Sequence, residues 1–413
     1  MRQFQARWFA VIALSWMLIG CAGISTHQSV SDNQPGNPPG SNAPPPSTHP
    51  QGKTFIAANF PGADCGAKIQ AADKAATQNG VIEVTPACGT SWKTPVAVGQ
   101  THTLLVENGT YQLAHTILLH DNACVEGQNA TLVMTVGADI ISNADAANSN
   151  LCVNAITLSA ATVTTGRSRG IYFKNVQGFT ISGVDLEAMR THGIFIDDGS
   201  DNGQILNNAC NGVTLGSCFL VGNGPGLAMV SNITISNNTA SNVKAGDGIF
   251  VIGSKNGQPT NHITISNNVL QCIRDTSIEI GEGVQFATAS NNQVTLCATG
   301  STGISVRSAQ HIVVENNTGG PMAPDTNMIG IFIWNNQGDP QPFQDVSVNQ
   351  NTMNGFAGQS SSGVSWSSFS PSSSDLSITN NTATGNASDF FARTNNIVNL
   401  VFTGNSDPVF QQQ

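Results

Sequence analysis

The chain has 413 residues, and only 10% of them are Asp, Glu, Lys or Arg. Acidic residues outnumber basic ones by 25 to 15, so no dense basic face is available for binding nucleic acid. A chain of this length exceeds the usual single globular core, and it predicts one large domain or an array of repeats.

Residues 1–20 have the features of an export signal. Arg2 and Arg7 precede "WFAVIALSWMLIG", an apolar run too short to span a bilayer comfortably. The run ends in "LIGC", which resembles the lipobox of bacterial lipoproteins. That resemblance implies that Cys21 is lipidated and holds the protein at the cell envelope, at the outer membrane or cell surface. The alternative is an ordinary signal peptide with an incidental cysteine.

Two segments separate this signal from the main body. Residues 21–52 are rich in Pro, Gly, Ser and Asn, so we expect a disordered tether. Residues 53–100 predict an N-terminal cap with the first strands. Within them, "ADCGAKIQAADKAATQNGVIEV" (63–84) favours a short amphipathic helix with Gly80 as its C-cap, followed by a strand.

The remaining residues, 101–413, contain an internal repeat. "SNITISNNTAS" at 231–241 returns as "NHITISNNVLQ" at 261–271. A repeat of this length is typical of a solenoid. The asparagine that closes the motif recurs along the chain, with Val184 in the equivalent position at the start: Asn208, Asn238, Asn268, Asn292, Asn317, Asn351, Asn381 and Asn405.

A second signature lies upstream in each unit. A Gly-Ile-x-Ile pattern or a close variant begins at Gly170, Gly193, Gly248, Gly303, Gly330 and Gly363, and Ser277 takes the same position in one unit. Each unit therefore predicts a Gly-Ile-x-Ile strand, a loop, an alternating strand, an Asn-Asn bend and a third short strand. Turns stacked ~4.8 Å apart would align the asparagines, whose amides then hydrogen-bond above and below.

These motifs resemble the right-handed parallel β-helix proteins of the pectin-lyase-like superfamily. The resemblance is clear over residues 160–405 and implies an all-β fold with three short strands per turn and a short N-terminal capping helix. It also implies a polysaccharide partner. The superfamily includes lyases, hydrolases, epimerases and adhesins, so the fold alone does not select an activity.

Eight cysteines besides Cys21 fall along the chain as neighbours. Export permits disulfides, although sequence alone leaves their connectivity open. Cys272 and Cys297 follow ladder asparagines on adjacent turns, close enough for a bond. We expect that pair and the local pair Cys210–Cys218; the remaining neighbours are Cys65 with Cys88 and Cys124 with Cys152.

Resemblance to the superfamily implies that substrate lies along the sheet of Gly-Ile-x-Ile strands. The candidate catalytic residues at the starts and outward positions of those strands are His192, Asp247, Arg274, Asp275, Glu279 and Arg307. We expect Asp247 and Asp275 to start equivalent strands on consecutive turns. Their carboxylates would then lie ~5 Å apart and shift each other's pKa.

Three chemistries stay open. "GDGIF" is similar to one polygalacturonase motif, but the double Asp, His-Gly and Arg-x-Lys motifs are absent. A lyase or epimerase needs a base, a proton donor and a cation, although the Asp-Pro-His-Glu signature of bacterial alginate epimerases is missing. No cofactor is implied, unless Asp275, Glu279 and Glu282 hold Ca²⁺ as in pectate lyases.

Two functions follow from this sequence. The first is an exported, lipid-anchored enzyme that acts on a polysaccharide by lyase, epimerase or hydrolase chemistry. The second is a non-catalytic surface protein that binds glycan or has a structural role. A capped solenoid buries its own core, so we expect a monomer.

Overall fold

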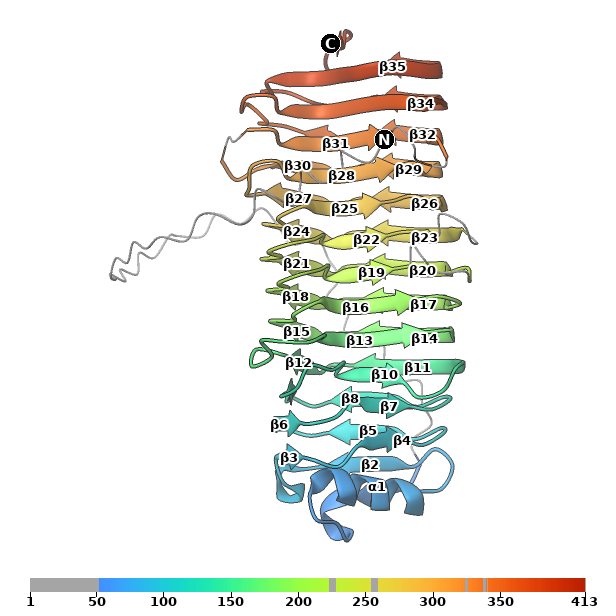
Figure 1. Cartoon of the computed structure of the whole chain (residues 1–413), viewed down its shortest axis with the longest axis vertical. Helices are drawn as coiled ribbons and strands as arrows, with labels where there is room; N and C mark the ends of the chain where they lie inside the picture. The colour runs from blue at the N-terminus through green and yellow to red at the C-terminus, as the bar shows by residue number, and fades with distance from the viewer. Residues whose placement is uncertain are drawn as a thin grey trace, which may run out of the picture. The chain divides into compact units, whose positions relative to one another are not determined.

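The computed structural model describes residues 52–222, 228–253, 259–323, 326–336, 339 and 341–412. These residues form a solenoid of short parallel strands, as Figure 1 shows. The predicted lipidation site at Cys21, the signal 1–20 and nearly all of the tether 21–52 lie outside the described residues. None of the described helices combines the length and hydrophobicity that crossing a bilayer requires.

The strands form three faces, one strand of each per turn. The first face contains the Gly-Ile-x-Ile strands and the strands that stack in line with them: β4 (Val96–Val98), β7 (Ile117–Leu119), β10 (Ile141–Asn143), β13 (Arg169–Lys174), β16 (His192–Asp197), β19 (Phe219–Val221), β22 (Ile249–Val251), β25 (Thr276–Ile280), β28 (Thr302–Arg307) and β31 (Ile329–Trp334).

The second face contains the strands that precede the Asn-Asn bends. Its members are β1 (Thr54–Ile56), β2 (Val81–Val84), β5 (Thr103–Val106), β8 (Cys124–Gly127), β11 (Asn148–Asn154), β14 (Val176–Ser182), β17 (Asp201–Leu206), β20 (Ser231–Ser236), β23 (Thr260–Ser266), β26 (Val284–Ser290), β29 (Gln310–Glu315) and β32 (Gln344–Asn349).

The third face is an 11-stranded sheet. Its members are β3 (Ser91–Trp92), β6 (Gly109–Leu113), β9 (Ala130–Met134), β12 (Thr157–Ser159), β15 (Asp185–Glu187), β18 (Ala209–Asn211), β21 (Thr239–Ser241), β24 (Val269–Gln271), β27 (Gln293–Leu296), β30 (Thr318–Pro321) and β33 (Thr352–Met353).

Two long strands join the first and second faces. β34 (Ser362–Thr379) pairs with β31 on the first face through its beginning and with β32 on the second face through its end. β35 (Ser388–Thr403) follows the same path, and β36 (Gln411–Gln412) pairs with it. As a result, the first two faces form one 25-stranded sheet.

The N-terminal end carries the predicted capping helix. α1 (Cys65–Ala75) begins at Asp64, whose side chain accepts a hydrogen bond from the Ala67 N–H, and it buries Ile69 and Ala72. The expected C-cap at Gly80 is wrong, because Ala76 is already extended and ends the helix. The short helices η1 (Ala57–Asn59) and η2 (Pro86–Cys88) complete this region.

The predicted asparagine ladder is confirmed. The Oδ1 atom of Asn268 accepts hydrogen bonds from the N–H of Asn238 at 2.9 Å and from its Nδ2 at 3.0 Å. The same side-chain bond continues from Asn208 to Asn405. At the start of the ladder, the Val184 N–H donates to Asn208. These buried amides are therefore satisfied without water.

The residue before each ladder asparagine explains why the motif has two asparagines. Asn237 and Asn267 both have φ of +57°, in the left-handed region. Asn tolerates that region better than most residues, and Gly183 and Gly404 occupy it elsewhere in the series. The first asparagine thus makes the bend, and the second makes the ladder.

Tight stacking explains the glycines that open the first-face strands. A Cβ atom on Gly248 would lie 2.6 Å from the carbonyl oxygen of Ser277, and one on Gly303 would lie 2.4 Å from that of Gly330. Buried isoleucines follow in register on successive strands and fill the interior, for example Ile249, Ile278 and Ile304.

The structure forms all four neighbouring disulfides. Cα–Cα distances are 4.7 Å for Cys272–Cys297 and 5.8 Å for Cys210–Cys218. The two less certain neighbours are also joined, at 5.1 Å for Cys65–Cys88 and 4.5 Å for Cys124–Cys152. Each of these bonds closes a short loop, within one turn or between adjacent turns of the solenoid.

Candidate functional site

Glu279 lies at the outward position of β25 on the first face. Its neighbours in register are Phe250 on β22 and Ser305 on β28. Ile278 and Ile280 on either side are fully buried, so the alternation of the strand turns Glu279 away from the core. The side chain is partly buried among its neighbours on the face.

Asp247 directly precedes Gly248, just before β22 on the adjacent turn. The pairing of Ile249 with Ile278 places Asp247 opposite Thr276. One carboxylate oxygen accepts the Thr276 N–H at 3.2 Å, and the other accepts the Ser217 hydroxyl at 3.4 Å. Asp247 is only 6% exposed, so its carboxyl group is buried yet held by neutral donors.

Both carboxyl groups keep a proton to a higher pH than an exposed carboxyl group would. Burial raises the pKa of Asp247 well above its usual range, and the negative charges of Glu279 and Asp275 raise it further. Burial also raises the pKa of Glu279 to about 7; Arg307 opposes this shift, whereas Asp275 and Glu282 add to it. A carboxyl group with a pKa near 7 can exchange protons at neutral pH.

Arg307 ends β28 beside Glu279 and is engaged by two buried carboxylates. Its guanidinium forms ion pairs with Glu282 and, at 3.4 Å, with Asp339. The guanidinium also lies 4.9 Å from the centre of the Trp334 ring. Asp339 in turn accepts the Ser308 hydroxyl at 2.7 Å. The charge of Arg307 is therefore already compensated within the protein.

We refer to Asp247, Glu279, Glu282, Arg307 and Asp339 as the acidic cluster. Asp275 borders it but does not start an equivalent strand, contrary to expectation. The Asp275 N–H bonds to the Gly246 carbonyl, so the residue is offset by one position from Asp247, and its side chain is exposed. Its charge still acts on the two central carboxyl groups.

Arg274 lies beside Asp275 and is exposed. In the described part of the chain we find no ion pair between its guanidinium and a carboxylate. Its backbone N–H bonds to the Val243 carbonyl, which fixes the turn before β25. The structure thus brings together Asp247, Glu279 and Arg307 from the candidate set and leaves Arg274 outside.

His192 belongs to a different group, at the start of β16. Its Nδ1 atom accepts the Ser217 N–H at 3.1 Å. Burial and the nearby Arg169 lower its pKa to about 4, so the imidazole is neutral at pH 7. Because Ser217 also bonds to Asp247, one residue links the two groups.

Arg169 and Tyr172 on β13 complete the second group. Arg169 is buried and makes two hydrogen bonds of 2.8 Å to Asp139, and its guanidinium lies 3.4 Å from the centre of the Tyr172 ring. The Tyr172 hydroxyl donates to Asp197 at 2.6 Å, and burial, with that carboxylate, raises its pKa to about 12. The polar groups of this second group are therefore paired with one another, which indicates a structural role.

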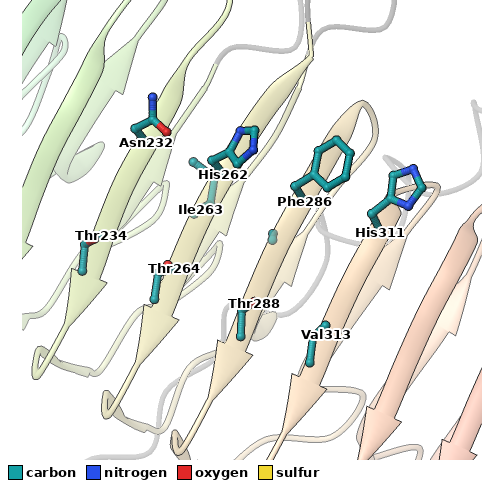
Figure 2. A pocket seen from close by; sticks show the side chains of 10 residues that line it. Asn232, Thr234, His262, Ile263, Thr264, Phe286, Thr288, His311 and Val313 are labelled. Carbon is teal, nitrogen blue, oxygen red and sulfur yellow. The ribbon is translucent and has the colours of Figure 1, made fainter.

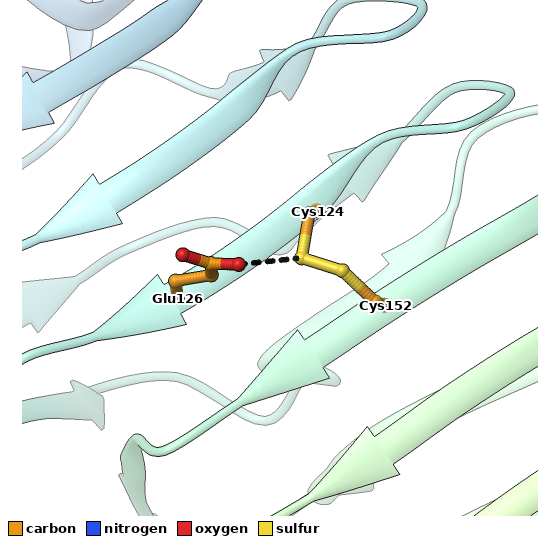
Figure 3. Close-up of side chains that lie close together, drawn as sticks. All are labelled: Cys124, Glu126 and Cys152. Atoms are coloured by element: carbon orange, nitrogen blue, oxygen red, sulfur yellow. Dashed lines mark hydrogen bonds between the residues drawn. A yellow bond between two sulfur atoms is a disulfide. The ribbon is translucent and has the colours of Figure 1, made fainter. Parts of the chain in front are cut away.

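The calcium hypothesis receives no support from the geometry. Among the described residues, one group of three His, Cys, Asp or Glu ligand atoms lies within 4.8 Å of one another: Cys124, Glu126 and Cys152. Figure 3 shows that its two sulfur atoms form a disulfide, which removes the thiolates a metal would need. Asp275, Glu279 and Glu282 do not form such a group.

Two contributors to the site escaped the sequence analysis. Asp339 lies in a loop after β31, outside every repeated motif, and Ser217 lies in register with Asp247 without any Gly-Ile signature beside it. The only signal for Ser217 is its position two residues before Phe219 of β19, which becomes visible once the register is known.

Known proteins resemble this chain in structure and not in sequence. No protein-family model and no curated protein matches it. The A-module of the mannuronan C-5 epimerase AlgE6 of Azotobacter vinelandii superimposes with a TM-score of 0.59 at 16% identity, over 85% of this chain and 98% of that module.

Two further structures represent different functions. The catalytic domain of a GH87 alpha-1,3-glucanase, in complex with nigerose, has a TM-score of 0.59 at 12% identity and covers 90% of this chain and 70% of its own. The surface adhesin PfbA of Streptococcus pneumoniae has a TM-score of 0.60 at 13% identity, over 86% of this chain and 97% of the adhesin. At such identities the likeness establishes the fold.

Proposed function

Starting from the fold of the pectin-lyase-like right-handed β-helix proteins, we propose that this chain is a glycoside hydrolase that cleaves an uncharged polysaccharide along its first face. The observation that carries the proposal is the placement of Asp247 and Glu279 on adjacent turns of that face, in mutual electrostatic contact. Paired carboxyl groups with different environments are the usual apparatus of glycoside hydrolysis.

The two environments suggest the two roles. Asp247 is the more buried group and keeps its proton, so it donates that proton to the oxygen of the breaking glycosidic bond. Glu279 is partly exposed beside Arg307 and takes a proton from the attacking water. The water oxygen bonds to the anomeric carbon as the bond to the leaving sugar breaks.

The charge of the site favours an uncharged substrate. The acidic cluster holds four carboxyl groups and one guanidinium, and the exposed Asp275 adds a further negative charge. A chain of uronate residues would meet like charge here, which disfavours its binding. A neutral glycan meets no such repulsion.

The engagement of Arg307 favours hydrolysis over elimination. A lyase or epimerase needs a cation to neutralise the substrate carboxylate as the adjacent carbon loses its proton. Arg307 interacts with Glu279 but is already paired with Glu282 and Asp339. It therefore serves better to hold the site together and to limit the pKa of Glu279.

A path for a polymer extends along the same face. The outward position of Glu279 continues in register through Ser305 to Phe332, whose ring stacks on Trp334 at 5.5 Å. Further on, a cavity of 380 Å³ is lined by residues that include Phe391 and Arg393. Aromatic rings beside hydroxyl-rich positions suit sugar rings, which have apolar faces and polar edges.

Release of reducing ends from neutral and acidic polysaccharides tests this proposal. We expect cleavage of a neutral glucan or galactan, no cleavage of polygalacturonate or alginate, and no unsaturated product. Asp247→Asn and Glu279→Gln should each lower kcat/KM by about a thousandfold. Glu187→Gln, an exposed acid on the third face, is the matched control and should leave kcat/KM unchanged. Equal activity of Glu279→Gln and the control would refute the assignment.

A non-catalytic glycan-binding protein is the second candidate function. The observation in its favour is the similarity in fold to the surface adhesin PfbA, which spans nearly all of that chain. Binding of a polysaccharide without any cleavage, unchanged in Asp247→Asn, would favour this reading over the hydrolase.

We further infer that the protein works outside the cytoplasm as a monomer on a lipid anchor. The four disulfides fit an oxidising compartment. Metabolic labelling with a fatty acid should mark the wild type and leave Cys21→Ala unlabelled; labelling of both would contradict the anchor. Sedimentation of the chain from residue 53 onward, which lacks the signal and the tether, should give a monomer, and a dimer would contradict that part.

A further inference from the structure

A groove lies on the second face, away from the acidic cluster. It has a volume of 590 Å³ and crosses strands β20, β23, β26 and β29 (Figure 2). Two rows of side chains border it. We name them the ring row (His262, Phe286 and His311) and the hydroxyl row (Thr234, Thr264 and Thr288).

The ring row is a slipped stack. Phe286 lies nearly parallel to His262 and to His311, with ring centres 5.3 Å and 4.5 Å apart. Ring centres this far apart fit the offset stacking that aromatic pairs prefer. Part of each ring face therefore remains uncovered, and Phe286 is 48% exposed.

The backbone under the ring row is unfavourable for the bulky Phe286, whereas histidine tolerates it better. His262, Phe286 and His311 have φ between +53° and +55°, in the left-handed region. That region costs a bulky residue roughly 1–2 kcal/mol. The same position on neighbouring turns is filled by residues that tolerate it, namely Asn202, Asn232, Asp345, Asp375 and Asn399. Rings here point to a use that offsets this cost.

The ring row is held in place by polar contacts at both ends. The Nδ1 atoms of His262 and His311 lie 2.9 Å from oxygen atoms of Asn261 and Asp345, respectively. Such contacts restrict ring rotation, so a ligand would lose little additional side-chain freedom on binding.

The hydroxyl row supplies the polar half of the groove. Figure 2 shows Thr234, Thr264 and Thr288 on successive strands beside the rings. Within the described structure these threonine hydroxyls make no hydrogen bond to protein. The groove-lining residues also include no Asp, Glu, Lys or Arg. A ligand for this surface should carry hydroxyl groups and no charge.

We propose that the ring row and the hydroxyl row form a second glycan-binding site, which holds an extended, uncharged polysaccharide chain along the solenoid axis. Both rows repeat once per turn, at ~4.8 Å, close to the length of one sugar unit in an extended chain. Successive sugars then meet a ring face on one side and a hydroxyl on the other. The site is separate from the acidic cluster and binds without cleaving.

Affinity electrophoresis of the full chain tests the site. All proteins carry Glu279→Gln, so that no polysaccharide is cleaved, and the gels contain pullulan, dextran, galactan, xylan or polygalacturonate. Phe286→Asn removes the ring and suits the left-handed backbone, so misfolding does not confound it. Val269→Asn, an exposed apolar side chain on the third face, is the matched control.

We expect at least one neutral polysaccharide to retard the Glu279→Gln parent and Val269→Asn equally. Phe286→Asn should bind at least about tenfold more weakly, which corresponds to about 1.4 kcal/mol. Thr264→Val should show a smaller loss, because it removes one hydroxyl and keeps the shape of the side chain.

Three results would overturn the proposal. They are retardation of the parent by none of the neutral polysaccharides, equal binding by Phe286→Asn, and preference for polygalacturonate. A concentration-dependent dimer that Phe286→Asn abolishes would also overturn it, because the surface would then bind a second copy. Failure of the hydrolase assay alone leaves this outcome intact, since no cleavage is needed for retardation.

Discussion

The asparagine ladder and the acidic cluster are both buried polar regions, and they are built in opposite ways. In the ladder, one residue type repeats on successive turns, and each amide bonds to the next. In the acidic cluster, the residue type changes from turn to turn, and burial together with neighbouring negative charges raises the pKa of Asp247 and Glu279.

That contrast separates structure from function within one fold. Repetition lets each polar group meet an identical partner, so the ladder lowers the free energy of the folded state. Where the repeat is broken, at Ser277 in place of glycine and at Glu279 between Phe250 and Ser305, the chain gathers like charges instead. Such destabilising arrangements are typical of functional sites.

Removing the cation should give the largest loss of stability. Arg307→Met leaves the buried Glu282 and Asp339 without this partner, and we expect it to lower the free energy of unfolding by about 4 kcal/mol. Arg167→Met removes a largely exposed member of another ion pair and should cost less than about 1 kcal/mol. Denaturant unfolding measures both; equal losses would remove the distinction between the regions.

Interrupting the ladder should have the next largest effect. Asn268→Ala removes the acceptor for the N–H of Asn238 and for one of its two Nδ2 hydrogen bonds, and we expect a loss of about 3 kcal/mol in unfolding free energy. Asn267→Gly changes only the exposed bend residue at φ +57° and should stay within about 0.5 kcal/mol. A loss confined to the Gly variant would contradict the division of roles between the two asparagines.

Stability should depend on pH through Glu279. Its pKa rises from 4.5 to about 7 on folding, so between these values the folded state binds the proton more tightly than the unfolded state. Its contribution to stability is therefore complete below pH 4.5 and is lost as pH rises through about 7, a change on the order of 3 kcal/mol. The difference in unfolding free energy between wild type and Glu279→Gln should follow this sign; a constant difference would contradict it.

The smallest effect should come from the exposed border of the cluster. Asp275 raises the pKa of Glu279, so Asp275→Asn should lower that pKa. The rising limb of kcat/KM against pH, which reports ionisation of Glu279, should then move to lower pH with little loss at its maximum. Asp185→Asn on the third face is the control. A shift toward higher pH would contradict the prediction that the charge of Asp275 raises the pKa of Glu279.

The regular parts of this molecule were predictable, because they are written once per turn. Asn268 and Asn292 define the register of their two turns, and that register already brings Cys272 near Cys297. The acidic cluster was only partly predictable. The predicted position of Asp275 is one residue too far along. The prediction aligns Asp275 with Asp247, whereas the strand openings at Gly248 and Ser277 align Asp247 with Thr276. Asp339 lies in a loop whose path no repeat determines.

Direction is the last feature of the ladder to consider. From Asn208 to Asn381, each ladder asparagine donates to the asparagine of the following turn, and Asn405 accepts the last of these bonds. A turn with matching upper and lower surfaces is a modular unit, so whole turns can be gained or lost by duplication or deletion without leaving an unmatched amide. The length of the solenoid is then free to vary in evolution, and with it the length of each face.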